Sequence, residues 1–214
     1  MIDFIGLLKE KYTVKERNIG AYAIMKKNGM KFNISAYEIE GIGNMSYFTM
    51  SAMLGLMKMQ TVVFTPLTVD APLFSFDYIN AMGNETLMLE LYSTQLGDID
   101  VSSLDEIKAR YHALPDHDLG SHWYDHLKMS PTLAKKGKKL TADYKKLCEE
   151  FFRGYVTVLS AAAPCEQAPK QEKVREYTNG LLNNGGPATD QFRKLFGEEA
   201  TVELFTKYIF SSES

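Results

Sequence analysis

The chain has 214 residues, of which 45% are hydrophobic and 24% are charged, and its formal net charge is −3. A chain of this length and composition can bury a full hydrophobic core without disulfides, and its negative charge argues against general nucleic-acid binding. No linker rich in Pro, Gly or Ser divides the sequence, so we expect one domain over residues 1–214.

The first half of the sequence predicts an N-terminal helix and then a meander of about six strands. The helix lies in MIDFIGLLKEKY, which is amphipathic and lacks the cleavage site of a signal peptide. Asn28-Gly29 between two alternating runs predicts a hairpin, Gly55 marks a further turn, and Gly83-Asn84 predicts a second hairpin. Because no long crossover separates the strands, they should pair mainly antiparallel.

After Gly97 the pattern becomes helical. The predicted helices lie in SSLDEIKARYHALP, TADYKKLCEEFFRGYVTVLSAAAP, PKQEKVREYTNGLL, PATDQFRKLFG and EEATVELFTKYIF. No apolar run reaches the ~18 residues that a membrane span requires, so we expect no membrane association. Strands followed by helices pack with the helices on the faces of the sheet. The expected fold class is therefore α/β in the α+β sense, a three-layer α/β/α sandwich with a central, mainly antiparallel sheet.

The histidines and cysteines match no common metal or cofactor motif. His122 and His126 have the spacing of a zinc pair on a helix, but the glutamate of that motif is missing and the segment is rich in loop formers. Cys148 and Cys165 form no disulfide framework, which fits a reducing compartment, and we expect a cytoplasmic protein. P-loop and Rossmann fingerprints are missing too, so we expect no metal and no nucleotide cofactor.

One acid lies where a strand should be most hydrophobic, Asp77 in FSFDYI. Strand alternation places it on the same face as Ser75 and Ile79. It is either a carboxylate on a solvated face or edge, or a carboxyl group in an apolar pocket. In the second case desolvation would raise its pKa, so that it could donate a proton at neutral pH. The pattern leaves both interpretations open.

A basic run, LAKKGKKL, contrasts with the acidic chain around it. It contains Lys135, Lys136, Lys138 and Lys139. Such a run is either an ordinary solvated face or a surface that attracts an acidic partner.

Three segments of the chain occur in the same order as in a known family. They are MQTVVFTPLTVDAPLFSFD, WYDHLKMSP and the C-terminal REYTNGLLNN…FRKLFGEEATVELFTKYIF. On these segments the chain resembles the ferredoxin-dependent bilin reductases over roughly residues 44 to 210. The fold of that family, an antiparallel sheet between helices, agrees with the fold expected from the strand and helix patterns.

The resemblance implies a function. Members of the family reduce a linear tetrapyrrole, a bilin, and they act as oxidoreductases on CH–CH groups with an iron–sulfur protein as donor. Ferredoxin or flavodoxin supplies single electrons, and no cofactor is bound. Asp77 matches the catalytic aspartate, which faces the pigment from a central strand and donates protons. The lysine run would then be the docking surface for the acidic electron donor.

Three positions depart from the family pattern. Gln60 stands where some branches have a histidine and others an asparagine, and Asn184 is the nearest match to a second aspartate. Phe48 replaces a pocket glutamate of one branch. The resemblance implies that these three residues contact the substrate without supplying a proton. The alternative function is therefore a non-catalytic protein of the same fold that binds a tetrapyrrole or another flat apolar ligand.

Overall fold

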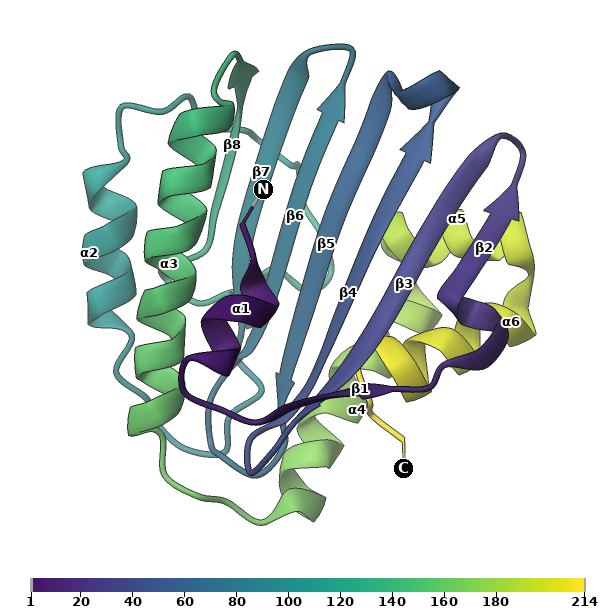
Figure 1. Ribbon diagram of the computed structural model, residues 1–214. Coiled ribbons are helices and arrows are strands. Elements are labelled where there is room, and N and C mark those ends of the chain that lie inside the picture. Colours follow the sequence, from purple (N-terminus) through teal and green to yellow (C-terminus); the bar gives the residue numbers. More distant parts are fainter. Residues whose placement is uncertain (1, 214) are drawn as a thin grey trace.

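The structure, a computed structural model that describes residues 2–213, is built on one eight-stranded antiparallel sheet (Figure 1). The strand order is β1-β3-β4-β5-β6-β7-β8, and β2 pairs with β3 beside β1. The strands are Val14–Arg17 (β1), Ile24–Lys27 (β2), Met30–Ile39 (β3), Gly43–Ala52 (β4), Met57–Pro66 (β5), Leu73–Ala81 (β6), Asn84–Tyr92 (β7) and Leu133–Lys138 (β8). Met1 and Ser214, the ends of the expected domain, lie outside the described residues.

The sheet has more strands than the sequence predicted. The hairpins at Asn28-Gly29 and Gly83-Asn84 are confirmed, joining β2 to β3 and β6 to β7. The additional strands include β8, which coincides with the basic run and pairs with β7 from Leu89↔Leu133 to Asn84↔Lys138. The lysine-rich composition of β8 gives no hydrophobic alternation, and the open edge of β7 supplies the pairing partner instead.

Helices cover both faces of the sheet (Figure 1). They are Phe4–Lys9 (α1), Ser102–Arg110 (α2), Thr141–Ala161 (α3), Gln167–Asn184 (α4), Pro187–Phe196 (α5) and Glu198–Glu203 (α6), followed by a π-helical turn, Leu204–Ile209. On one face lie α1 and α3, with α2 beside α3, and on the other lie α4, α5 and α6. Among residues 2–213 no helix is long and apolar enough to cross a bilayer.

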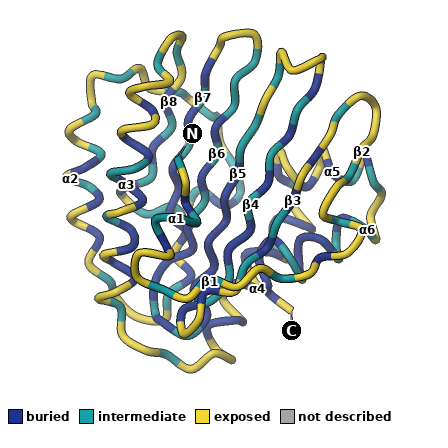
Figure 2. The backbone as a smooth tube through the Cα atoms, in the orientation of Figure 1, coloured by how far each residue is buried: buried dark blue, intermediate teal, exposed yellow. Residues whose placement is uncertain are grey.

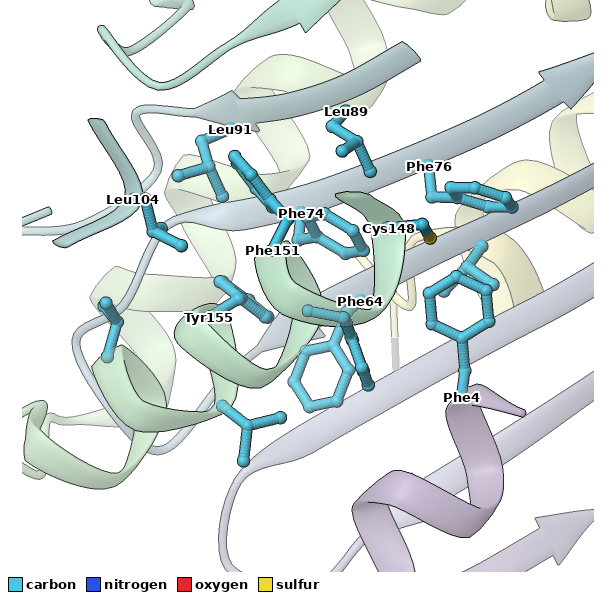
Figure 3. Packing of buried hydrophobic residues seen from close by; sticks show 14 of the residues in the cluster. Phe4, Phe64, Phe74, Phe76, Leu89, Leu91, Leu104, Cys148, Phe151 and Tyr155 are labelled. Carbon is cyan, nitrogen blue, oxygen red and sulfur yellow. The ribbon is translucent and has the colours of Figure 1, made fainter. Parts of the chain in front are cut away.

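The face beneath α1 and α3 is a densely packed aromatic core (Figure 3). The ring centroid of Phe74 on β6 lies 5.0 Å from that of Tyr155 and 6.2 Å from that of Phe151, both on α3. Phe4 of α1 packs on Phe76 of β6, with their ring centroids 4.8 Å apart. Aromatic rings bury large apolar areas, so this cluster holds the helices on the sheet.

The opposite face also carries aromatic residues, but it leaves room for a cavity. The ring centroid of Phe32 on β3 lies 5.0 Å from that of Phe192 on α5, and the ring centroid of Tyr92 on β7 lies 4.7 Å from that of Tyr177 on α4. Figure 2 shows the central strands mainly buried or intermediate along their length and exposed at the hairpin turns, whereas β2 at the edge is largely exposed. Because side chains alternate along a strand, Asp77 lies on the face opposite Phe74 and Phe76.

Candidate functional site

A cavity of about 550 Å³ lies between the sheet and the layer formed by α4, α5 and the C-terminal π-helical turn. Its volume is within the range of about 300–1,000 Å³ that is typical of small-molecule sites. Its lining is mainly apolar and includes five methionines, Met30, Met50, Met57, Met59 and Met88. Methionine side chains adapt to irregular shapes, so the wall suits an apolar ligand.

Asp77 lies in the middle of β6 and faces this cavity. Strand β5 places Thr61 directly opposite, and the hydroxyl of Thr61 donates a hydrogen bond to the carboxylate. Burial within the protein raises the pKa of Asp77 to about 7; the Thr61 hydrogen bond opposes this rise and the nearby Glu90 carboxylate adds to it. The side chain stays partly accessible because the cavity opens onto it. At neutral pH, Asp77 therefore holds a proton in a substantial fraction of molecules.

A second carboxylate lies close by and was missed by the sequence analysis. Glu90 of β7 is paired with Ser75 in the sheet register, one diagonal step from Asp77, and it also lines the cavity. Its Oε1 lies 3.1 Å from Nζ of Lys128, which also contacts Asp125 at 3.0 Å. Burial opposes the charge on Lys128, but these two carboxylates raise its pKa above the usual value. The sequence did contain a signal for it: Glu90 lies inside the apolar run MLELYS, as Asp77 lies inside FSFDYI.

The histidine-rich loop, residues 117–126, forms one wall of the cavity. His122 and Tyr124 line it, and their rings stack with centroids 4.9 Å apart. Among the residues that the structure describes, no group of three or more His, Cys, Asp or Glu side chains is arranged to hold a metal ion. The role of this loop in the cavity wall was not expected from its sequence.

Trp123 attaches this loop to α4. Its Nε1 donates a 2.9 Å hydrogen bond to the carbonyl oxygen of Gly185. The indole lies so close to Gly180 that a Cβ on that glycine would come within 2.1 Å of the ring. Gly180 is therefore required for the close approach of the loop to the helix.

Of the residues expected to contact a ligand, Asp77 and Phe48 line the cavity. Gln60 is absent from this lining, and its expected contact with a ligand stays a prediction. It pairs with Tyr78 in the register, on the α3 face, and its neighbour Thr61 occupies the cavity position beside Asp77. A shift of one residue along a strand moves a side chain to the other face of the sheet. The Oε1 atom of Gln60 is buried without a hydrogen-bond partner among the described residues.

Asn184 is also outside the cavity lining. It is the last residue of α4, and it is exposed to solvent. The chain returns to the cavity wall two residues later, at Gly186, and the expected contact of Asn184 with a ligand stays a prediction.

The four lysines of β8 and its C-terminal end do not share one environment. The ammonium group of Lys135 is buried and donates hydrogen bonds to the carbonyl oxygen of Leu114 at 2.9 Å and to Asp116 at 2.6 Å. Lys136, Lys138 and Lys139 are exposed. The basic surface at this edge is therefore formed by three of the four lysines.

No protein-family model and no curated protein sequence matches this chain. A solved structure does: phytochromobilin synthase from tomato, in complex with biliverdin, is similar with a TM-score of 0.78 and 11% sequence identity. The match covers 97% of this chain and 81% of the tomato chain. Phytochromobilin synthase is a ferredoxin-dependent bilin reductase, so the resemblance expected from the sequence is confirmed at the level of the fold.

Proposed function

We propose that the cavity binds a linear tetrapyrrole, and that Asp77 protonates it while single electrons arrive from a ferredoxin or flavodoxin. The observation that carries this proposal is a carboxyl group with a pKa of about 7 on the wall of a mainly apolar cavity. An acid with a pKa near the working pH is the most effective proton donor. The similarity to a tomato synthase that holds biliverdin supports the ligand class.

The proton step follows from the groups around Asp77. Addition of one electron makes the bound pigment more basic, and the neutral carboxyl group of Asp77 then transfers its proton and becomes a carboxylate. Thr61 fixes the orientation of the carboxyl group by its hydrogen bond. The negative charge of Glu90 favours the protonated form of Asp77, so the proton is retained until the pigment needs it. Solvent reprotonates Asp77 between turnovers through the cavity.

The electron donor would dock near the exposed Lys136, Lys138 and Lys139. Ferredoxins and flavodoxins are acidic, and exposed ammonium groups raise the rate of encounter with an acidic partner. Lys135 takes no part in this surface, because its ammonium group is buried and paired with Asp116. The reaction class is the reduction of a CH–CH unit with an iron–sulfur or flavin protein as donor.

A non-catalytic binding protein is the alternative function. Of the residues that the structure describes, no lysine or arginine lines the cavity. The carboxylates of a biliverdin-like pigment would therefore have to lie at the mouth of the cavity. A flat apolar ligand without acidic groups needs no such arrangement, and this observation favours the alternative.

Visible spectroscopy tests both functions. The protein is mixed with biliverdin, and the spectrum is recorded before and after addition of ferredoxin with an enzymatic source of electrons. If the protein reduces the pigment, the visible absorption band of biliverdin should shift on binding. It should then bleach or move to shorter wavelength only after ferredoxin is added. Binding without the second change supports the alternative, and no change at either step contradicts both functions for this ligand.

A further inference from the structure

Three hairpin turns lie side by side at one end of the sheet, at the upper edge in Figure 1. They join β2 to β3, β4 to β5 and β6 to β7. The register brings the last two together, because Met57 pairs with Ala81 and the N–H of Met82 donates a 2.9 Å hydrogen bond to the carbonyl oxygen of Leu56. We call this edge the tip surface; its residues are Lys26, Lys27, Lys31, Met53, Leu54, Leu56, Lys58 and Met82.

The tip surface exposes large apolar side chains. Met53, Leu56 and Met82 each keep more than half of their surface exposed, and Leu54 is fully exposed. Among residues 2–213, six large apolar side chains are exposed, and these four lie together on the tip surface. Single exposed apolar residues are common, but a contiguous group marks an interaction site.

The backbone at these turns gives independent support. Met53, Leu54 and Met82 have φ angles of 52°, 55° and 51°, in the left-handed region that disfavours bulky side chains. The hairpin between β2 and β3 has Asn28-Gly29 at φ angles of 49° and 75°, and the hairpin between β6 and β7 has Met82-Gly83 at 51° and 80°. Asparagine is the residue that suits this position, so Met82 places an apolar side chain where a polar one would be more stable. Strain of this kind persists where it serves a function.

The charges on the same edge are positive. Lys26, Lys27, Lys31 and Lys58 are exposed, and Lys58 follows the turn at Gly55 by three residues. The only acid in residues 24–31, 51–58 and 79–86 is Glu85, which is buried. Its carboxylate accepts hydrogen bonds from the hydroxyl groups of Tyr78 and Thr141. In a chain of net charge −3, these three ranges therefore contain exposed lysines and no exposed acid.

The sequence analysis expected no membrane association because no segment can span a bilayer, but a surface contact needs no such segment. We propose that the tip surface docks on an anionic lipid bilayer. Apolar side chains surrounded by lysines match an interface in which acyl chains lie beneath acidic head groups. The exposed side chains project from separate turns, and a bilayer accepts them without a complementary shape. The cavity residues Met30 and Met57 follow directly after two of the turns, so a docked protein would turn this end of the cavity towards the lipid. The proposal goes beyond the proposed reaction and does not depend on it.

The test is co-sedimentation with vesicles of phosphatidylcholine alone and of equimolar phosphatidylcholine and phosphatidylglycerol. We expect binding to the anionic vesicles only, with a decrease at high salt. The double variant L54N/M82N should bind about ten-fold more weakly or less, because two apolar anchors are lost. Asparagine suits the left-handed turns, so the variant should melt at the same or a higher temperature, which excludes misfolding as the cause.

Matched controls test whether vesicle binding depends on the tip surface in particular, and not on any exposed apolar side chain or any exposed lysine. L96N removes an exposed leucine at the opposite end of the sheet, and K9Q/K11Q removes two exposed lysines elsewhere, so both should bind like the unaltered protein. The matched K26Q/K27Q variant should bind more weakly. Equal binding by L54N/M82N and the unaltered protein would overturn the proposal. Lack of binding to the anionic vesicles would also overturn it, and slower ferredoxin-dependent electron uptake in L54N/M82N would then assign the surface to an acidic protein.

Discussion

Asp77 is a carboxyl group whose neutral form the fold favours, and the causes are its immediate neighbours. Burial among apolar side chains raises the pKa, the Thr61 hydroxyl limits the rise, and Glu90 extends it. Glu90 itself is held by Lys128 at 3.1 Å. The two acids of the cavity therefore differ: the neutral form of Asp77 is favoured, whereas Glu90 is held in an ion pair.

We predict that Asp77→Asn folds, binds the pigment and then fails at the proton step. The amide keeps the shape of the side chain but has no proton to transfer. Turnover should fall by about 10²- to 10⁴-fold, and a pigment radical should accumulate after single-electron reduction, visible by electron paramagnetic resonance. The control is Asp98→Asn, which alters an exposed aspartate outside the cavity lining. Unchanged turnover in Asp77→Asn would remove Asp77 from the mechanism.

The same substitution predicts a pH dependence of stability. The pKa of Asp77 is raised from 3.8 to about 7, so the folded state binds this proton more tightly than the unfolded state does. Its contribution to stability is complete below pH 3.8 and is lost as the pH rises through about 7. Because asparagine does not titrate, Asp77→Asn should gain stability relative to the unaltered protein as the pH rises, by up to about 4 kcal/mol. Melting curves of both proteins from acidic to alkaline pH measure this difference, and a constant difference contradicts the raised pKa.

Among the secondary-structure elements, the contact between α4 and the histidine-rich loop positions one wall of the cavity. Trp123 lies against Gly180 and donates a hydrogen bond to Gly185, while its neighbours His122 and Tyr124 face the cavity. The loop has no regular structure of its own beyond a short 3₁₀ turn at Asp125–Leu127. Its position therefore depends on the helix.

We predict that Gly180→Ala displaces this loop and weakens ligand binding. Within a helix, alanine is normally more stable than glycine by about 1 kcal/mol. Here the added Cβ would come within 2.1 Å of the Trp123 ring, so the effect should be reversed. The chain has one tryptophan, and its fluorescence spectrum reports directly on the displacement. Asn179→Ala, at an exposed position of the same helix, should leave the fluorescence unchanged; a stabilised Gly180→Ala protein with unaltered fluorescence would contradict this contact.

For the whole molecule, the distribution of charge matters more than its sum. The net charge is −3, yet the exposed lysines at the end of β8 and those of the tip surface lie at the same end of the sheet. Exposed charges contribute little to stability, but they direct association with partners of opposite charge. Lys135 differs because its ammonium group is buried and paired with Asp116.

We predict that K136Q/K138Q/K139Q melts at nearly the same temperature as the unaltered protein but receives electrons from ferredoxin more slowly at low salt. The salt dependence of its turnover should also be weaker, because the steering charges are missing. Lys135→Gln should instead lower the free energy of unfolding by about 1–3 kcal/mol, because the carbonyl oxygen of Leu114 and the carboxylate of Asp116 lose their hydrogen-bond donor. Stopped-flow kinetics and melting curves separate the two cases, and unaltered kinetics of the triple variant would exclude this docking surface.

The sequence by itself determined the features that depend on near neighbours. Asn28-Gly29 indicated a tight turn because its backbone preference is local, and the alternation around Asp77 assigned it to the same face as Ser75 and Ile79. The helices after Gly97 were visible because the spacing of apolar residues repeats within each segment.

Only the tertiary structure decided what each of these faces meets. It showed that Asp77 faces a cavity and not solvent, that Thr61 and not Gln60 lies beside it, and that Lys128 pairs with Glu90. It also paired the basic run with β7 and buried Lys135. Each of these outcomes depends on the register between strands or on contacts between residues far apart in the chain. Such contacts are set by the packing of the whole molecule, so no local pattern in the sequence can encode them alone.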